Sequence, residues 1–255
     1  MCAWLKDGYY YHSSRIYLLL ACFLNIDSLL GPYRPIRFND NFEEKWVIIK
    51  TSFADFLASG LIAWNPTSIT GNHALLFTVS PFNPFALLTQ ILPTWGVYSI
   101  WLIVHCFIGG YGLHLYLFRT LKVSLLGSYI ASFFFVIFLF NLFYIEYLFL
   151  CAFPLFLYCF QQCLSPENKN KLKYIIIILF LFISSSAPYT IIPFLVFHFI
   201  FIICLVRPWE KIRNYLLLFF LIWFSYGLIH APTIYALLSE LPFSNRLDFS
   251  DSSLL

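Results

Sequence analysis

Charged residues are scarce in this chain of 255 residues. Asp, Glu, Lys and Arg together make up 11% of the sequence, whereas a soluble domain contains about a quarter of such residues. Apolar residues account for 61%, and the mean hydropathy is +0.81. A water-soluble domain of this length needs more polar residues than this to cover its surface. The composition therefore excludes an ordinary soluble domain and favours lipid as the main solvent.

Paired cysteine motifs are also missing. The chain has seven cysteines but no C-x-x-C spacing, and most of them fall within apolar runs. We interpret them as small apolar packing residues rather than as redox centres or metal ligands. The net charge of +3 is spread over many loops, so the sequence predicts no nucleic-acid partner.

A cleavage site after the first apolar stretch is the third missing feature. No small-residue motif follows that stretch, and the segment before Arg15 is long and aromatic. A secretory signal peptide would combine a short charged start with such a site. We therefore expect the N-terminus to remain as an uncleaved first helix.

Long apolar runs dominate what is present. A helix needs roughly 20 mostly apolar residues to span a bilayer, because its backbone groups must bond within the segment. Seven segments approach this length: 15–31, 95–118, 123–143, 144–164, 172–187, 191–206 and 214–230. The sequence predicts an all-α, polytopic integral membrane protein with about seven transmembrane helices in one domain, 1–255.

The basic residues predict the orientation. Cytoplasmic loops of membrane proteins carry an excess of Lys and Arg. A cytoplasmic N-terminus places ten of the fifteen basic residues inside: Lys6, Arg15, Arg119, Lys122, Lys169, Lys171, Lys173, Arg207, Lys211 and Arg213. We therefore expect a multi-pass protein whose N-terminus is cytoplasmic and whose loop 32–94 lies on the outer side.

The outer loop 32–94 is expected to contain structure of its own. Segment 46–64 has apolar residues at helical spacing with polar residues between them, which is typical of a helix lying in the membrane interface. Segment 74–93 is apolar but broken by prolines, so it suits a re-entrant or interfacial element.

Two acidic residues on the predicted outer side are candidates for catalysis. Asp40 follows the first helix, where a carboxylate can act as a general base or bind a divalent cation such as Mg²⁺ or Mn²⁺. Glu146 lies in the short connection between the third and fourth predicted helices, flanked by tyrosines. The alternatives are a solvated loop carboxylate for Asp40 and a headgroup-level helix end for Glu146.

Four histidines lie in or at the ends of the predicted helices: His105, His114, His198 and His230. Ionisable groups within a membrane are functional hypotheses by default. The structural alternative is a neutral imidazole that bonds a neighbouring helix.

Short motifs in a fixed order carry a resemblance to a known family. The outer loop contains three of them: Phe38-Asn39-Asp40, Ala63-Trp64-Asn65-Pro66 and Ser80-Pro81-Phe82-Asn83-Pro84. After the outer loop, Gly109, Gly110 and Gly112 precede Arg119. Farther along the chain, Ala231-Pro232-Thr233 precedes Arg246. The ordered set resembles the YfhO-like bacterial membrane proteins, which are similar to GT-C glycosyltransferases. Such proteins are longer, so the chain resembles their N-terminal part.

The resemblance implies a reaction and a site. A sugar would pass from a polyprenyl-phosphate donor to a cell-envelope glycan or lipid acceptor, on the extracytoplasmic face of a bacterial inner membrane. Asp40 would be the catalytic base or metal ligand, with Glu146 as a second acid. Asn65, His73 and Arg246 would bind substrate. Arg246 could pair with the donor phosphate, because a guanidinium matches phosphate oxygens.

Two other functions remain open. One is a non-enzymatic membrane protein such as a flippase, a transporter or an assembly partner, which would favour paired broken helices and internal symmetry. The sequence has one such break, at Ser184-Ser185-Ser186-Ala187-Pro188. The other is a histidine-dependent acyltransferase, which we rank last of the three functions.

Overall fold

The chain is described here by a computed structural model that covers most of the predicted helices. The described residues are 3–30, 50, 53–54, 64–65, 72–73, 83–141, 148–166, 168–184, 192–205, 212–231 and 234–235. The helices are α1 (Ala3–Leu24), α2 (Ile26–Leu29), α4 (Pro84–Leu88), α5 (Thr94–Leu115), the π-helical turn η2 (Tyr116–Thr120), α6 (Leu125–Asn141), α7 (Leu148–Leu164), α8 (Lys171–Ser184), α9 (Ile192–Leu205) and α10 (Ile212–Ile229). The only described strands are β1 (Trp64–Asn65) and β2 (Asn72–His73).

The predicted all-α architecture is confirmed. Each of the seven apolar segments overlaps a helix, and these helices are α1, α5, α6, α7, α8, α9 and α10. The first differs most from its predicted bounds, because α1 begins at Ala3 rather than Arg15 and ends at Leu24. Within the described residues, two helices are long and apolar enough to cross a membrane: Thr94–Thr120, which joins α5 to η2, and Ile212–Ile229. Seven membrane crossings therefore stay a prediction.

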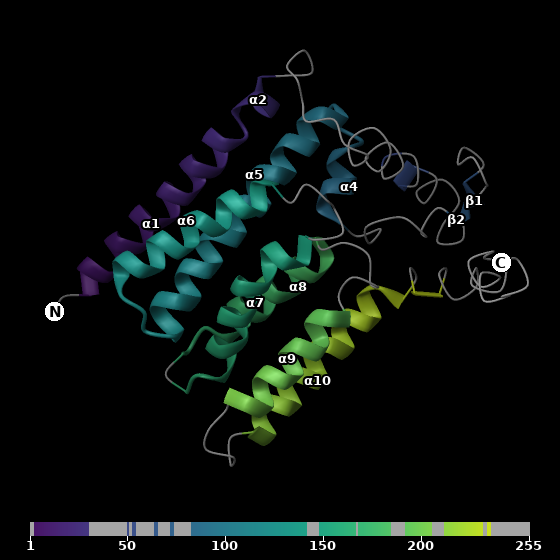
Figure 1. Ribbon diagram of the computed structural model, residues 1–255. Helices are drawn as coiled ribbons and strands as arrows, with labels where there is room; N and C mark the ends of the chain where they lie inside the picture. The colour runs from purple at the N-terminus through teal and green to yellow at the C-terminus, as the bar shows by residue number, and fades with distance from the viewer. Residues whose placement is uncertain are drawn as a thin grey trace, which may run out of the picture.

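Helix α5 lies at the centre of the first half of the bundle. It contacts α1, α2, α4, α6 and α7, and Figure 1 shows it running between α1 and α6 on one side and α7 on the other. Its glycines explain how so many helices approach it. Added Cβ atoms on Gly109 and Gly110 would overlap side chains of α6, and one on Gly112 would lie 2.6 Å from the Leu155 Cβ of α7. Glycine allows helix backbones to approach closely.

The second half of the bundle packs on α7. Helix α8 contacts α7, and α10 contacts both α8 and α9. Aromatic side chains fill the space between them: the Phe156 ring lies 5.7 Å from Phe182 and 5.9 Å from Trp223, centroid to centroid. Phe156 and Phe182 are fully buried. Tilted ring pairs at these separations favour stability beyond simple burial.

The connections between helices place basic residues together. The start of α1, the η2–α6 connection and the α7–α8 connection lie at one end of the bundle, while α4, β1 and β2 lie toward the other (Figure 1). We call the first end the basic end, because its connections and adjoining turns carry Arg119, Lys122, Lys169, Lys171 and Lys173.

The outer loop is described in parts. Lys50, Phe53 and Ala54, from the predicted interfacial helix, are helical, and Phe53 is buried in an apolar cluster with α4 and α5. The predicted broken segment 74–93 contains α4. Pro84 begins this helix, where a missing N–H is tolerated, and the Asn83 side chain accepts a hydrogen bond from Phe85 N at 2.8 Å.

Candidate functional site

Three of the five predicted site residues lie outside the described residues: Asp40, Glu146 and Arg246. The other two, Asn65 and His73, lie on β1 and β2. The strands pair antiparallel, with Trp64 opposite His73 and Asn65 opposite Asn72. Asn65 and His73 therefore lie on neighbouring strands, each paired with the residue next to the other in sequence. Eight positions separate these two predicted substrate-binding residues along the chain.

Asn83, from the proline-rich motif, joins the start of α4 to the end of α8. It is almost fully buried. Its Oδ1 caps α4, and its Nδ2 donates a hydrogen bond to Ser184 O at 3.2 Å, at the last residue of α8. The carbonyls of a helix's last turn have no partner within the helix, so Asn83 satisfies one of them. The motif residue therefore has a structural role here.

The histidines form hydrogen bonds within and between helices. His230 Nε2 lies 3.1 Å from Phe182 O of α8, and His105 Nδ1 lies 2.8 Å from Trp101 O of its own helix. Trp223 Nε1 of α10 donates to His198 Nδ1 of α9 at 3.2 Å. Indole nitrogen is a donor only, so this bond places the ring proton of a neutral His198 on Nε2. These contacts match the structural alternative for His198 and His230.

A cleft that the sequence reasoning missed lies between α5, α7 and α8. It has a volume of about 800 Å³, which is in the usual range of about 300–1,000 Å³ for small-molecule sites. We call it the α5–α7–α8 cleft. Its described lining is Phe107, Ile108, Tyr111, Leu115, Arg119, Leu155, Tyr158, Cys159, Gln162, Ser165, Asn168, Lys173, Tyr174, Ile177, Phe180 and Leu181.

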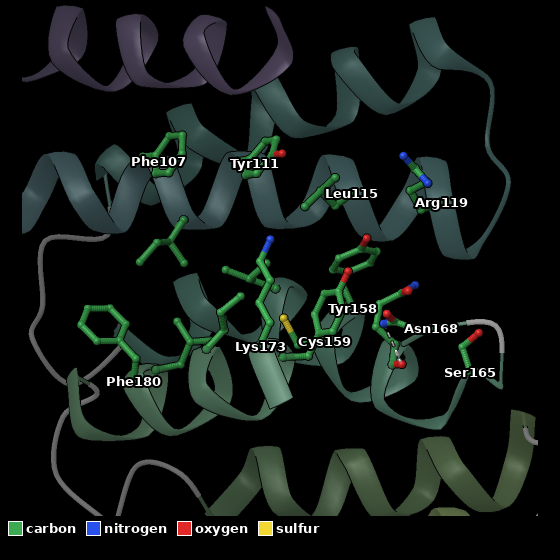
Figure 2. A pocket seen from close by; sticks show the side chains of 16 residues that line it. Phe107, Tyr111, Leu115, Arg119, Tyr158, Cys159, Ser165, Asn168, Lys173 and Phe180 are labelled. Atoms are coloured by element: carbon green, nitrogen blue, oxygen red, sulfur yellow. Dashed lines mark hydrogen bonds between the residues drawn. The ribbon is translucent and has the colours of Figure 1, made fainter. Parts of the chain in front are cut away.

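Polar and apolar residues separate along this cleft. Figure 2 shows Arg119, Ser165 and Asn168 at one end and Phe107 and Phe180 at the other, with Lys173 reaching inward between them. The separation follows from chain position: η2 and the α7–α8 connection supply the polar end, and the interiors of α5 and α8 supply the apolar end. The cleft is therefore amphipathic, with its polar part at the basic end of the bundle.

Hydrogen bonds order the α7–α8 connection at the polar end. Asn168 Nδ2 donates to Gln162 O at 3.2 Å, and Asn168 Oδ1 accepts from Asn170 N at 3.0 Å. The second bond is an Asx-type turn, in which a side chain imitates a backbone turn. These bonds hold Asn168 against the last turn of α7 at the polar end of the cleft.

The signal for this cleft was present in the sequence but incomplete. Arg119 and Lys173 are part of the predicted inner set of basic residues, yet 54 positions separate them along the chain. Loop charge indicates orientation, and it does not indicate which residues meet. Only the packing of α5 against α7 and of α7 against α8 brings the two cations to one cleft.

The divalent cation predicted at Asp40 has no test in this structure. Asp40 lies outside the described residues, and the part of the chain that is described contains no group of three or more His, Cys, Asp or Glu residues able to hold a metal ion. A cation requirement stays a prediction.

Comparison of the chain with protein-family models, curated proteins and solved structures gives no match. The resemblance to YfhO-like proteins rests on the sequence motifs.

Proposed function

We propose that the chain is a polytopic membrane protein, and one observation carries this proposal: the outward surface of the bundle is apolar. On α10 the exposed large side chains form one stripe. Leu217, Phe220, Leu221, Phe224 and Leu228 are each 60–65% exposed, and their spacing of three and four residues places them on a single helix face.

Lipid explains this stripe better than water does. An apolar side chain of this size gains about 1.5–3 kcal/mol when it is transferred fully from water, so a row of five in water would be strongly unfavourable. Similar exposed residues recur on other helices, including Leu19 and Phe23 of α1 and Leu126 and Phe134 of α6. Exposed apolar patches of this extent mark surfaces that face a membrane or a partner.

Polar side chains lie inside the bundle instead. Ser13, Ser128, Ser132 and His198 are fully buried, and Ser13 Oγ lies 2.7 Å from the Tyr129 hydroxyl, which joins α1 to α6. Hydroxyl groups that bond between helices stabilise bundles in lipid, where polar groups avoid the acyl chains. An apolar outside and a partly polar inside together support the membrane proposal.

For the reaction we propose sugar transfer of GT-C type on the extracytoplasmic side. The acceptor hydroxyl oxygen attacks the anomeric carbon of the donor, the bond from that carbon to the phosphate oxygen breaks, and the lipid phosphate leaves with the electron pair. Asp40 takes the hydroxyl proton. The ordered motifs support this assignment, as does the pairing of the Asn65 and His73 strands.

The test compares sugar transfer from labelled polyprenyl-phosphate sugars in membranes that carry wild-type chain, Asp40→Asn or Asp27→Asn at matched expression. Asp27 is an exposed acid on α2 and serves as the control. We expect Asp40→Asn to lower transfer by at least about 10²-fold, because general-base catalysis contributes typically 10²–10⁴-fold. Asp27→Asn should retain activity.

Two outcomes contradict the proposal. Equal transfer by Asp40→Asn and wild type removes Asp40 from the catalytic role. Transfer by none of the three chains removes the enzymatic function and favours the non-enzymatic flippase, transporter or assembly partner.

A further inference from the structure

The α5–α7–α8 cleft is separate from the predicted outer site. It shares no residue with the predicted set Asp40, Asn65, His73, Glu146 and Arg246. Its polar end lies at the basic end of the bundle, whereas β1 and β2 lie toward the opposite end (Figure 1). A ligand in the cleft would therefore approach from the other side of the membrane.

The described lining of the cleft is positively charged. The described lining contains the cations Arg119 and Lys173 and no carboxylate. Arg119 is half-buried on η2, and Lys173 is in the first turn of α8. Lys173 is exposed to solvent. Together the two cations give the described lining a net positive charge, which attracts an anion.

The polar end also supplies neutral hydrogen-bonding groups. Gln162, Ser165, Asn168 and the tyrosines Tyr158 and Tyr174 line it. A guanidinium, an ammonium group and several amide and hydroxyl groups suit an oxyanion with several acceptor oxygens, such as a phosphate.

The apolar end suits a hydrocarbon chain. Phe107, Leu155, Ile177 and Phe180 line it, and Phe180 is exposed on the outward surface of α8. Because that surface faces lipid in the proposed setting, a chain can continue from the cleft into the bilayer without crossing polar groups.

We propose that the α5–α7–α8 cleft binds a phosphate-bearing lipid, with the phosphate between Arg119 and Lys173 and an acyl or prenyl chain along Phe107 and Phe180. The inference rests on the proposed membrane setting and is independent of sugar transfer. Recovery of the chain in the membrane fraction tests the setting, so a failure of the setting is distinguishable from a failure of lipid binding.

The experiment measures lipid retention by the full chain in neutral detergent, using native mass spectrometry. The probes are dioleoyl phosphatidic acid, dioleoylglycerol with the same chains and no phosphate, and glycerol phosphate without chains. We expect phosphatidic acid to be retained at least about tenfold more than either of the others, since hydrogen bonds to charged groups are the stronger class.

Charge-neutral variants locate the binding. Arg119→Gln and Lys173→Gln should each weaken phosphatidic acid binding by about tenfold, because each removes one charge-assisted contact. Arg213→Gln is the matched control, because Arg213 is an exposed cation at the start of α10 that does not line the cleft. It should bind as wild type does.

Several results overturn the proposal. Equal retention of dioleoylglycerol excludes recognition of the phosphate, and full competition by glycerol phosphate at equal concentration excludes recognition of the chain. An equal loss in Arg213→Gln shows that binding follows overall charge only.

A measurement on the wild-type chain covers the case in which a variant does not fold. Phosphatidic acid with a photoreactive acyl chain should label peptides of α5 and α8 around Phe107 and Phe180 above all others. Labelling spread evenly over the outward faces of α1, α6 and α10 would contradict a defined site.

Discussion

At Gly112 the backbones of α5 and α7 come into direct contact. An added Cβ would lie 2.8 Å from Leu155 N and 2.9 Å from Leu155 Cα. Backbone atoms cannot move aside as a flexible side chain can, so any larger residue forces the two helices apart. Residue size at Gly112 therefore limits how closely α5 and α7 can approach.

We predict that Gly112→Ala lowers the free energy of unfolding by about 1–3 kcal/mol, the usual effect of overpacking. Gly96→Ala is the control, because nothing lies within 4 Å of a Cβ added there. Its effect should be neutral or favourable by up to about 1 kcal/mol from helix propensity. Denaturation in detergent, followed by tryptophan fluorescence, measures both. Equal stability of the two variants would contradict the close approach.

The glycines also show how much of the residue-level structure could be predicted. The run Gly109, Gly110 and Gly112 was visible in sequence as part of a motif. Its function as the contact surface for α6 and α7 was not, because helix periodicity does not say which neighbour each face meets. Asn83 is similar: its motif was noticed, but its bond to Ser184 O joins residues 101 positions apart.

At the scale of one element, α10 has one buried face and one exposed face. Phe219, Ile222, Trp223 and Tyr226 are buried against the bundle, while the exposed stripe described above is equally apolar. In a water-soluble protein the second face would carry charge. The helix is apolar all round, which is typical of a segment between protein and lipid.

We predict that Phe220→Lys with Phe224→Lys prevents stable membrane integration of α10. Each lysine near the centre of a membrane helix costs about 2.5–3.5 kcal/mol on insertion scales. The readout is the fraction of the chain that resists alkaline carbonate extraction. Phe220→Leu with Phe224→Leu is the control and should integrate normally. A lysine variant that resists extraction as fully as the wild type does would contradict a lipid-facing stripe.

At the scale of the whole molecule, the connections that carry several of the predicted inner basic residues lie at one end of the bundle. The η2–α6 and α7–α8 connections lie at the same end as the start of α1. In a membrane, all three would face one compartment, and the excess of Lys and Arg there predicts that this compartment is the cytoplasm.

We predict that topology reporters distinguish the two ends. A reporter that is active only outside the cytoplasmic membrane should be inactive when fused after Asn170 and active when fused after Gln90, which precedes α5 at the opposite end. Reporter protein levels, measured by immunoblot, serve as the control. The reverse activity pattern would overturn the orientation, and activity at both positions would overturn the membrane crossing by α5 through α7.

The sequence by itself determined which segments are helices. An apolar run long enough to satisfy its own backbone hydrogen bonds has few alternatives to a helix in lipid, so all seven segments were located without knowledge of the packing. The bounds of α10, Ile212–Ile229, differ from the predicted 214–230 by only two residues at the start and one at the end.

Only the tertiary structure decided which side chains meet. Arg119 and Lys173 line one cleft because α7 packs against both η2 and α8, and His198 meets Trp223 because α9 packs against α10. These contacts depend on helix rotation and separation, which depend on side-chain volume at the interfaces. Local hydropathy contains no information on either, so the cleft could be recognised only after the helices were assembled.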